Sequence, residues 1–156
     1  MSREDELNQN TWKFEHSVEC PVSRDFAWQF WTDISNWPVV DSSVESVQLD
    51  GPFATGARGI TKPRDLPPVE WQIIEVQDRS IARIEIPAPG AVLKSFWRFE
   101  DSTTAGSRMT QTVSLEGERA GEYVKQVGPE LENGIPQTMR RLAEEMTRAA
   151  NKQSSR

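Results

Sequence analysis

The sequence predicts a single α+β domain, in which a curved antiparallel sheet of about seven strands wraps around a long C-terminal helix. Three observations support this prediction. Apolar and polar residues alternate from Trp12 to Cys20, which is typical of a strand with one buried face. Short alternating segments, separated by glycine and proline turns, follow between Val44 and Leu115. From Gly121 the apolar residues recur every three or four positions, which indicates an amphipathic helix.

Two short helical segments are expected after the first strand. Ser23 is a suitable N-cap for a helix with apolar residues between Phe26 and Ile34. Asn36-Trp37-Pro38 ends this helix, because proline disfavours the helical conformation of the residue before it. A second helical turn is expected immediately afterwards. Residues 1–10 are almost entirely polar and are expected to be disordered.

Six further strands are predicted from alternation and turn residues. Their regular spacing indicates consecutive antiparallel hairpins. The segment 69–76 is apolar on both phases, so we expect it to be covered on both sides. The six predicted strands are 44–49, 57–62, 69–76, 81–86, 93–100 and 109–116.

The last helix is the only element long enough to cover the apolar face of such a sheet. Pro129 and Pro136 interrupt its first half. Either proline kinks the helix, or Pro129 lies near the start of a main helix at about 129–150. Residues 151–156 are expected to fray, which leaves 11–150 as the folded domain.

Composition excludes several classes of function. The net charge is −6, and the basic residues are scattered among acidic ones, which argues against nucleic acid as a partner. One histidine and one cysteine cannot form the usual metal clusters, and no phosphate loop or dinucleotide fingerprint occurs, so we expect no metal or cofactor. The sequence shows no apolar run of about 18 residues, so we expect no integral membrane association and a cytoplasmic location. The oligomeric state stays open.

Several short motifs, taken in order, resemble one superfamily. They are Val18-Glu19-Cys20-Pro21-Val22, Asp33-Ile34-Ser35-Asn36-Trp37-Pro38, Gly106-Ser107-Arg108-Met109-Thr110 and Leu142-Ala143-Glu144-Glu145. The chain resembles the START/Bet v 1-like (SRPBCC) superfamily, and more narrowly its polyketide cyclase/dehydrase and lipid-transport group. Many relatives carry a second tryptophan where this chain has Val40. The resemblance implies a helix-grip fold with a cavity between sheet and C-terminal helix, and it carries over no catalytic residue.

Nine residues are candidates for lining that cavity. Polar side chains on apolar faces stand out among them, because a buried polar group needs a partner. That partner is a ligand, a neighbouring strand or a bound water. Large aromatic side chains near the middle of strands either line a pocket or fill the core. The candidates are Phe14, His16, Trp71, Ser95, Trp97, Met109, Gln111, Tyr123 and Met139.

Three of these candidates carry chemistry that an enzyme could use. His16 is the only histidine, and it lies on the apolar phase of the first strand. It is either an acid–base group facing the cavity or a histidine satisfied by a neighbouring strand. Tyr123 is the only tyrosine, and it is either a proton donor or part of the core. Gln111 either orients a ligand or bonds across strands.

Three functions are compatible with these features. The first is a carrier or sensor of a small hydrophobic, lipid- or polyketide-like molecule. The second is an enzyme of the polyketide cyclase/dehydratase type that acts in the same cavity. The third is a partner-binding module whose cavity holds little. The predicted lining of tryptophan, phenylalanine, leucine and methionine favours holding an apolar ligand over transforming one.

Overall fold

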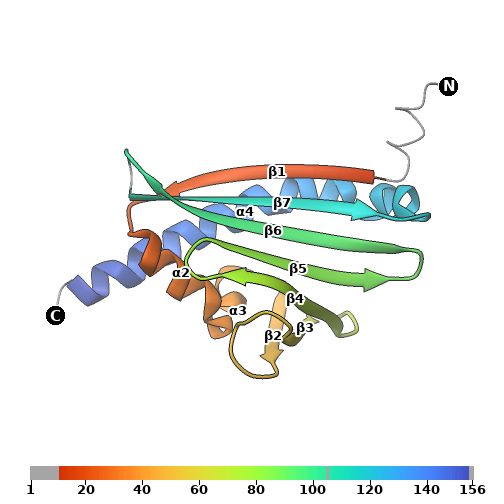
Figure 1. Ribbon diagram of the computed structural model, residues 1–156, viewed down its shortest axis with the longest axis horizontal. Coiled ribbons are helices and arrows are strands. Elements are labelled where there is room, and N and C mark those ends of the chain that lie inside the picture. The colour runs from red at the N-terminus through yellow and green to blue at the C-terminus, as the bar shows by residue number, and fades with distance from the viewer. Residues whose placement is uncertain (1–10, 105, 155–156) are drawn as a thin grey trace.

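The computed structural model describes residues 11–104 and 106–154, and within these the element order agrees with the prediction. One strand is followed by two short helices, six strands and one long helix (Figure 1). The predicted disordered segment, residues 1–10, lies outside the described residues. The elements are β1 (Thr11–Cys20), α2 (Arg24–Thr32), a 3-10 turn (Ile34–Asn36), α3 (Trp37–Val40), β2 (Val44–Leu49), β3 (Arg58–Pro63), β4 (Val69–Gln77), β5 (Ile81–Ala88), β6 (Ala91–Ser102), β7 (Gly106–Glu116) and α4 (Ala120–Ser154).

The seven strands form one open antiparallel sheet in the order β1-β7-β6-β5-β4-β3-β2. The register of β1 with β7 runs without interruption from Thr11 to Cys20. By contrast, β4 pairs with β5 only between Gln72 and Gln77, with a register shift at Ile73/Glu75. The start of β4 therefore leaves β5, and the sheet opens at this place.

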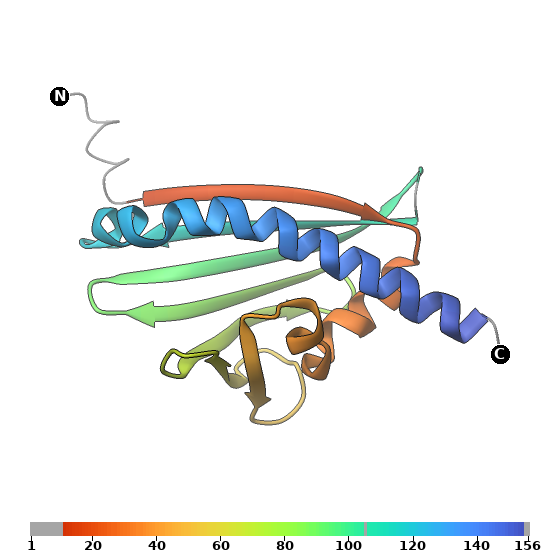
Figure 2. The same cartoon turned by 180° about the vertical axis from the view of Figure 1, so that it is seen from behind.

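Helix α4 covers the inner face of the sheet beside β1 (Figure 2). Its 35 residues correspond to about 52 Å of helix. Both prolines lie inside it, and the helix changes direction along its length (Figure 2). Of the two alternatives, a helix interrupted by its prolines is therefore the one observed, and a start near Pro129 is not. A proline inside a helix costs about 3 kcal/mol, and burial of the apolar stripe that includes Met139 and Met146 outweighs this cost. Residues 151–154, expected to fray, are helical, because no glycine or proline ends the helix there; residues 155–156 lie outside the description.

The two short helices are tied to each other by local hydrogen bonds. The Phe26 amide donates to the Ser23 hydroxyl at 3.1 Å, which confirms the predicted N-cap of α2. The Asn36 side-chain amide donates to the Phe30 carbonyl at 2.9 Å. The Trp37 indole N–H donates to the Trp31 carbonyl at 2.7 Å. These bonds fold α3 back onto the last turn of α2.

The closed part of the core lies where α2 and α4 cover the inner face of β6 and β7. Phe99, Met109, Met139 and Met146 are each at most 1% exposed there. The outer face is not covered in the same way. Ile74 is 39% exposed, so the expectation that β4 is covered on both sides is wrong. The bulge at Ile73/Glu75 adds one residue to β4 and turns Ile74 outward. Among the described helices, none has a stretch long and apolar enough to cross a membrane.

Candidate functional site

A cavity of about 310 Å³, called the inner cavity here, lies between α3, α4 and the inner face of the sheet. Its volume is at the lower end of the range of about 300–1,000 Å³ that is usual for ligand pockets. Most of its lining is aromatic or aliphatic. The lining residues are Trp31, Trp37, Val40, Asp41, Val44, Thr61, Trp71, Ile84, Ile86, Ser95, Trp97, Gln111, Thr138 and Leu142.

Four indole rings form one wall of the inner cavity. The ring centroids of Trp71 and Trp37 are 5.5 Å apart, and those of Trp37 and Trp31 are 5.9 Å apart. Trp97 continues the row at 4.8 Å from Trp31. All four residues are separated in sequence, and they meet because α2, α3, β4 and β6 converge on this side of the sheet.

Two hydrogen bonds satisfy polar groups inside this apolar lining. The Gln111 side-chain amide donates to the Ser95 hydroxyl at 3.1 Å, across the β6–β7 pair. The Trp71 indole N–H donates to the Thr61 hydroxyl at 2.9 Å. A buried polar group without a partner would be costly, so these bonds make the polar lining stable without a ligand. In both pairs an oxygen atom, of a hydroxyl group or of the Gln111 amide, can still form a hydrogen bond with a ligand.

Asp41 is the single ionisable residue among the described residues that line the inner cavity. Its Oδ1 atom accepts hydrogen bonds from the Ser43 amide at 2.9 Å and the Ser43 hydroxyl at 2.6 Å. The carboxylate is therefore oriented by the turn between α3 and β2.

A second hollow of about 760 Å³, the helix groove, runs between α4 and the α3–β2 turn. It shares five lining residues with the inner cavity, so the inner cavity opens to the surface through it. Its rim is charged, with Arg140 and Arg141 beside Glu130 and Glu144. The shared residues are Val40, Asp41, Trp97, Gln111 and Thr138.

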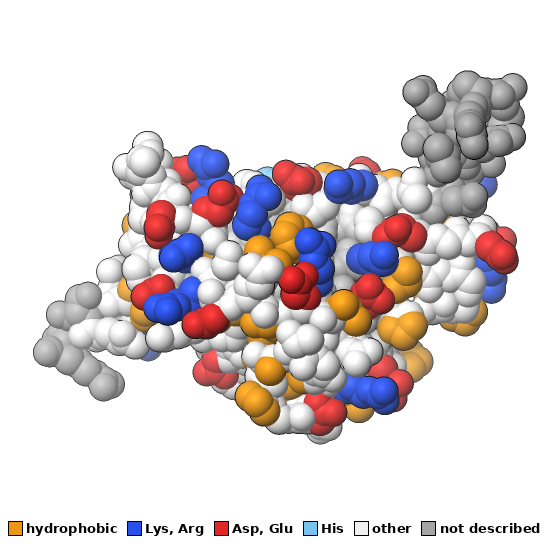
Figure 3. All heavy atoms as spheres, in the orientation of Figure 1, with side chains coloured by type: hydrophobic (Ala, Val, Ile, Leu, Met, Phe, Trp, Pro, Cys, Tyr) orange, Lys and Arg blue, Asp and Glu red, His pale blue; other side chains and the backbone are white. Residues whose placement is uncertain are grey.

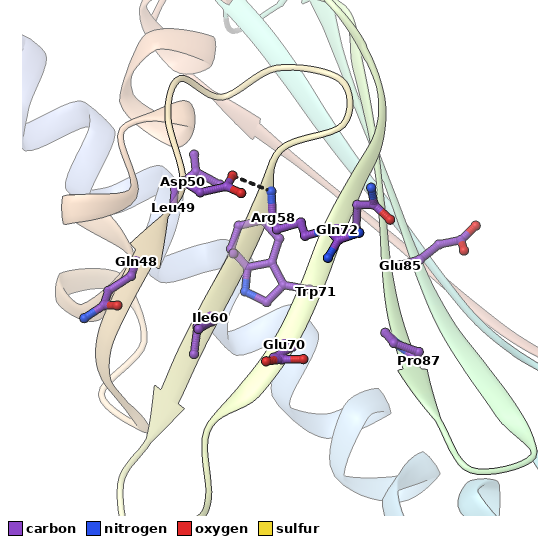
Figure 4. A pocket seen from close by; sticks show the side chains of 11 residues that line it. Gln48, Leu49, Asp50, Arg58, Ile60, Glu70, Trp71, Gln72, Glu85 and Pro87 are labelled. Carbon is purple, nitrogen blue, oxygen red and sulfur yellow. Dashed lines mark hydrogen bonds between the residues drawn. The ribbon is translucent and has the colours of Figure 1, made fainter.

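A third hollow of about 610 Å³, the outer groove, lies over β2–β5 at the opening of the sheet. Figure 4 shows the Trp71 side chain crossing from β4 towards β3, while Glu85 and Pro87 lie on β5 across the opening. Trp71 lines both the outer groove and the inner cavity. Its ring therefore separates the two hollows.

The structure brings four of the nine predicted residues together in the inner cavity. Trp97 and Trp71 contribute indole rings, and Ser95 and Gln111 contribute the central polar pair. The sequence left the orientation of Trp71 ambiguous, and the structure places it inward at 4% exposure. Cross-strand bonding of Gln111, one of the alternatives considered, is the arrangement observed.

Phe14 and His16 are not among the residues that line the inner cavity, and a role of either in ligand binding stays a prediction. Both lie on the inward phase of β1, as the alternation indicates. However, α4 runs alongside β1, so the helix covers this strand and the cavity forms farther across the sheet (Figure 2). Phe14 stacks on Trp12, with ring centroids 6.4 Å apart. His16 is half-buried beside Gln111 in the β1–β7 register.

Met109, Met139 and Tyr123 also lie outside the inner cavity. The two methionines are fully buried in the closed core. Core packing is compatible with their positions on apolar faces of β7 and α4. The Tyr123 hydroxyl donates to the Pro89 carbonyl at 2.9 Å. The Arg119 guanidinium lies 5.8 Å from the centre of the Tyr123 ring. Tyr123 thus ties the start of α4 to the β5–β6 turn.

Several lining residues were not among the predicted site residues. Trp31 was visible in the sequence as part of an amphipathic helix, although not as a site residue. Thr61 was not identified because its apolar neighbour, Ile60, suggests that the other phase of the strand faces inward. In the structure Ile60 faces outward at 39% exposure. Asp41 and Thr138 carried no signal, because only the packing of α3 against α4 brings them together. The aliphatic residues Ile84 and Ile86 could be assigned to an inward face, but not to a hollow.

The ionisable groups with shifted pKa values lie outside the inner cavity. On the outer face, the hydrogen bond from Arg108, followed by those from Thr104 and Ser102, lowers the pKa of Glu19. Bonds from Gln77 and Arg83 lower the pKa of Glu75. Figure 3 shows acidic and basic side chains intermixed over this face rather than gathered by sign. In the core, burial raises the pKa of the Cys20 thiol.

Comparison with models of protein families shows which family the chain belongs to. The family model described as polyketide cyclase / dehydrase and lipid transport matches residues 11–151, nearly the whole chain. The chain belongs to this family. Within the wider superfamily, the structural neighbours are Bet v 1-like, which agrees with the resemblance of its motifs. A search of the curated proteins gives no sequence match.

Solved structures with the same fold share little sequence with this family member. A norcoclaurine synthase point mutant from Thalictrum flavum, in complex with a transition-state analogue, has a TM-score of 0.70 and 15% identity, covering 90% of this chain and 96% of the synthase. The di-domain ARO/CYC StfQ from the steffimycin biosynthetic pathway has a TM-score of 0.75 and 11% identity, covering 96% of this chain and 54% of StfQ. TTHA0849 from Thermus thermophilus has a TM-score of 0.69 and 16% identity, covering 88% and 99% of the two chains. These likenesses show the fold.

Proposed function

We propose that the protein binds a small, largely apolar molecule in the inner cavity and acts as a carrier or sensor of it. The observation that supports this proposal is a hollow of about 310 Å³ with mainly aromatic and aliphatic lining, open to the surface through the helix groove. An apolar ligand gains affinity there by leaving water, at about 25 cal/mol for each Å² of apolar surface buried. The Gln111–Ser95 pair gives it one orienting polar contact.

Thermal denaturation with a library of apolar compounds tests the proposal. A ligand that binds only the folded state, at 100 times its Kd, adds about 2.7 kcal/mol to the free energy of unfolding and raises the Tm. Ile86→Phe places a larger side chain in the cavity lining and should reduce this shift. Ile74→Phe, the same substitution on the exposed face of β4, should leave it unchanged. If no apolar compound raises the Tm, the proposal fails and a partner-binding role takes its place.

A second candidate function is an enzyme of the polyketide cyclase/dehydratase type. Asp41 supports it, because it is the one described lining residue able to take or give a proton. Two structural neighbours with this fold also support it, namely the synthase in complex with a transition-state analogue and the ARO/CYC protein from a biosynthetic pathway. Asp41→Asn keeps the shape of the side chain, so loss of turnover with ligand binding retained would favour the enzyme. The cytoplasmic location stays a prediction.

A further inference from the structure

The row of four indoles occupies space that the fold would otherwise add to the inner cavity. Trp37 stacks on Trp31 with an interplanar angle of 29°, and on Trp71 with an angle of 25°. It therefore lies between α2 and β4, and its ring forms part of the cavity wall. The other wall of the cavity is formed by β5, through Ile84 and Ile86.

Trp37 is held in place from several directions. Its indole N–H donates to the Trp31 carbonyl at 2.7 Å, and Asn36 anchors the preceding turn to Phe30 at 2.9 Å. Pro38 restricts the backbone after it. Moving the ring aside would leave the Trp31 carbonyl without this donor and would break both ring stacks. Trp37 is therefore a fixed wall of the cavity.

The remaining volume limits what can enter. At about 30 Å³ for each water-sized group, a cavity of 310 Å³ holds about ten such groups. A longer chain would have to continue into the helix groove. The rim of that groove carries Glu130, Arg140, Arg141 and Glu144, which are exposed, so a methylene group there stays close to water and charge. Additional chain length therefore gains little affinity.

The lining also favours rings over flexible chains. Trp31 and Trp71 both stack on the faces of the Trp37 ring. The Trp37 indole therefore presents an edge, and not a face, to the open space. The positive edge of an aromatic ring attracts the negative face of another in an edge-to-face arrangement. The Ser95 and Thr61 hydroxyls and the Gln111 amide supply hydrogen bonds for one hydroxyl or carbonyl group.

We propose that Trp37 sets the upper size limit of the inner cavity, which selects compact aromatic molecules of one or two rings with one hydrogen-bonding group over long acyl chains. This inference rests on the proposed ligand-binding function. It goes further by naming the class of ligand and the residue that determines the selection.

Calorimetric titration with two ligand series tests this. One series is straight-chain fatty acids of six to sixteen carbons, and the other is phenols of one to three fused rings. A buried methylene raises affinity about fourfold, from about 0.8 kcal/mol each, so the fatty-acid series should stop gaining at about ten carbons. The phenols should bind best at one or two rings. Trp37→Leu should move both limits to larger ligands, whereas Trp12→Leu, which lies on β1 outside the cavity, should not.

Ile86→Phe gives the opposite test and does not depend on the folding of the Trp37 variant. It should shorten the chain length at which affinity stops rising, while Ile74→Phe leaves that length unchanged. Affinity that rises steadily to sixteen carbons in the natural sequence overturns the inference but leaves the proposed function standing. A folded Trp37→Leu variant with unchanged limits also overturns it. If no member of either series binds, the inference and the proposed function fail together.

Discussion

The interior of this protein has two regions that share one sheet but differ in packing. The closed core, around Phe99, Met109 and Met139, is at most 1% exposed and is covered by α2 and α4. The inner cavity, around Trp37, Ser95 and Ile86, is enclosed by the same helices and by α3, yet it keeps about 310 Å³ of free space. The difference shows that one sheet can support a closed core and a hollow side by side.

Strand geometry explains much of the difference. The β1–β7 pair keeps one register over its whole length, so successive side chains face α4 at regular intervals. In the other half of the sheet, β2–β3 and β4–β5 both contain a register shift, at Val44/Ser46 and Ile73/Glu75. Bulges bend a strand and increase its twist. This half of the sheet therefore curves away from α4, and the space between them stays partly empty.

The largest expected effect comes from two isoleucines on opposite sides of this comparison. Ile73, at 0% exposure, belongs to the closed packing, whereas Ile86 is half-buried and lines the cavity. Ile73→Ala should lower the free energy of unfolding by about 2–5 kcal/mol, because it removes transfer energy and leaves a new void. Ile86→Ala should cost about half of that or less, because its side chain already lacks neighbours on one side. Urea denaturation at equilibrium measures both.

Equal losses for the two variants would contradict the comparison. They would indicate that the space beside Ile86 closes in solution and that the cavity is not a stable feature. A change in the m-value of only one variant would point instead to an effect on the unfolded ensemble.

The regularity that closes the core also made it predictable. The alternation from Trp12 to Cys20 identified β1 and its inward face, and the stripe through Met139 identified the buried side of α4. These patterns are local and repeated, so a single sequence carries them. The start of α4 stayed open in the sequence because Pro129 is unfavourable in a helix by itself, and only contacts with distant strands compensate for it.

The cavity was less predictable, because its boundaries depend on how elements meet. Ser95, Trp97 and Gln111 were found from phase alone, since polar or large residues on an apolar face are visible in sequence. Phase could not separate them from Phe14 and His16, which share the inward face but lie under α4. An inward phase says that a side chain points to the interior, and not whether the interior is filled there.

Substitutions at two glycines should have effects of intermediate size on stability, one beside the indole row and one on α4. A β-carbon at Gly59 would overlap the Trp71 ring, so glycine at this inward position of β3 leaves room for one end of the indole row. Gly59→Ala should therefore displace the ring and destabilise the protein by about 1–3 kcal/mol. Gly134, on the face of α4 that lines the helix groove, has open space around it, with nothing within 4 Å of an added β-carbon. Gly134→Ala should stabilise the helix by about 0.5–1 kcal/mol.

Thermal denaturation and tryptophan fluorescence follow both glycine variants. A shift of the emission spectrum is expected for Gly59→Ala and not for Gly134→Ala. If Gly59→Ala were as stable as the natural sequence, with unchanged emission, the indole row would be more mobile than its stacking implies.

The smallest effect concerns one carboxylate on the outer face of each half of the sheet. Glu19, at the regular end of β1, accepts hydrogen bonds from Arg108 at 2.9 Å, Thr104 at 2.9 Å and Ser102 at 3.2 Å. Glu75, at the β4–β5 bulge, accepts from Gln77 at 2.9 Å and Arg83 at 2.9 Å. These bonds lower both pKa values below the usual 4.5, so folding favours the charged forms.

The stabilisation by each carboxylate should therefore be complete above pH 4.5 and should disappear as the pH falls through the lowered pKa of the folded state. Both carboxylates are exposed, so Glu19→Gln and Glu75→Gln should each lower the free energy of unfolding only slightly at pH 7. Urea denaturation of the natural sequence and both variants between pH 7 and pH 3 measures it. A deficit for Glu19→Gln that persists unchanged to pH 3 would mean that shape, not charge, holds the end of β1. If only Glu19→Gln is less stable than the natural sequence, the carboxylate charge stabilises the regular half of the sheet and not the bulged half.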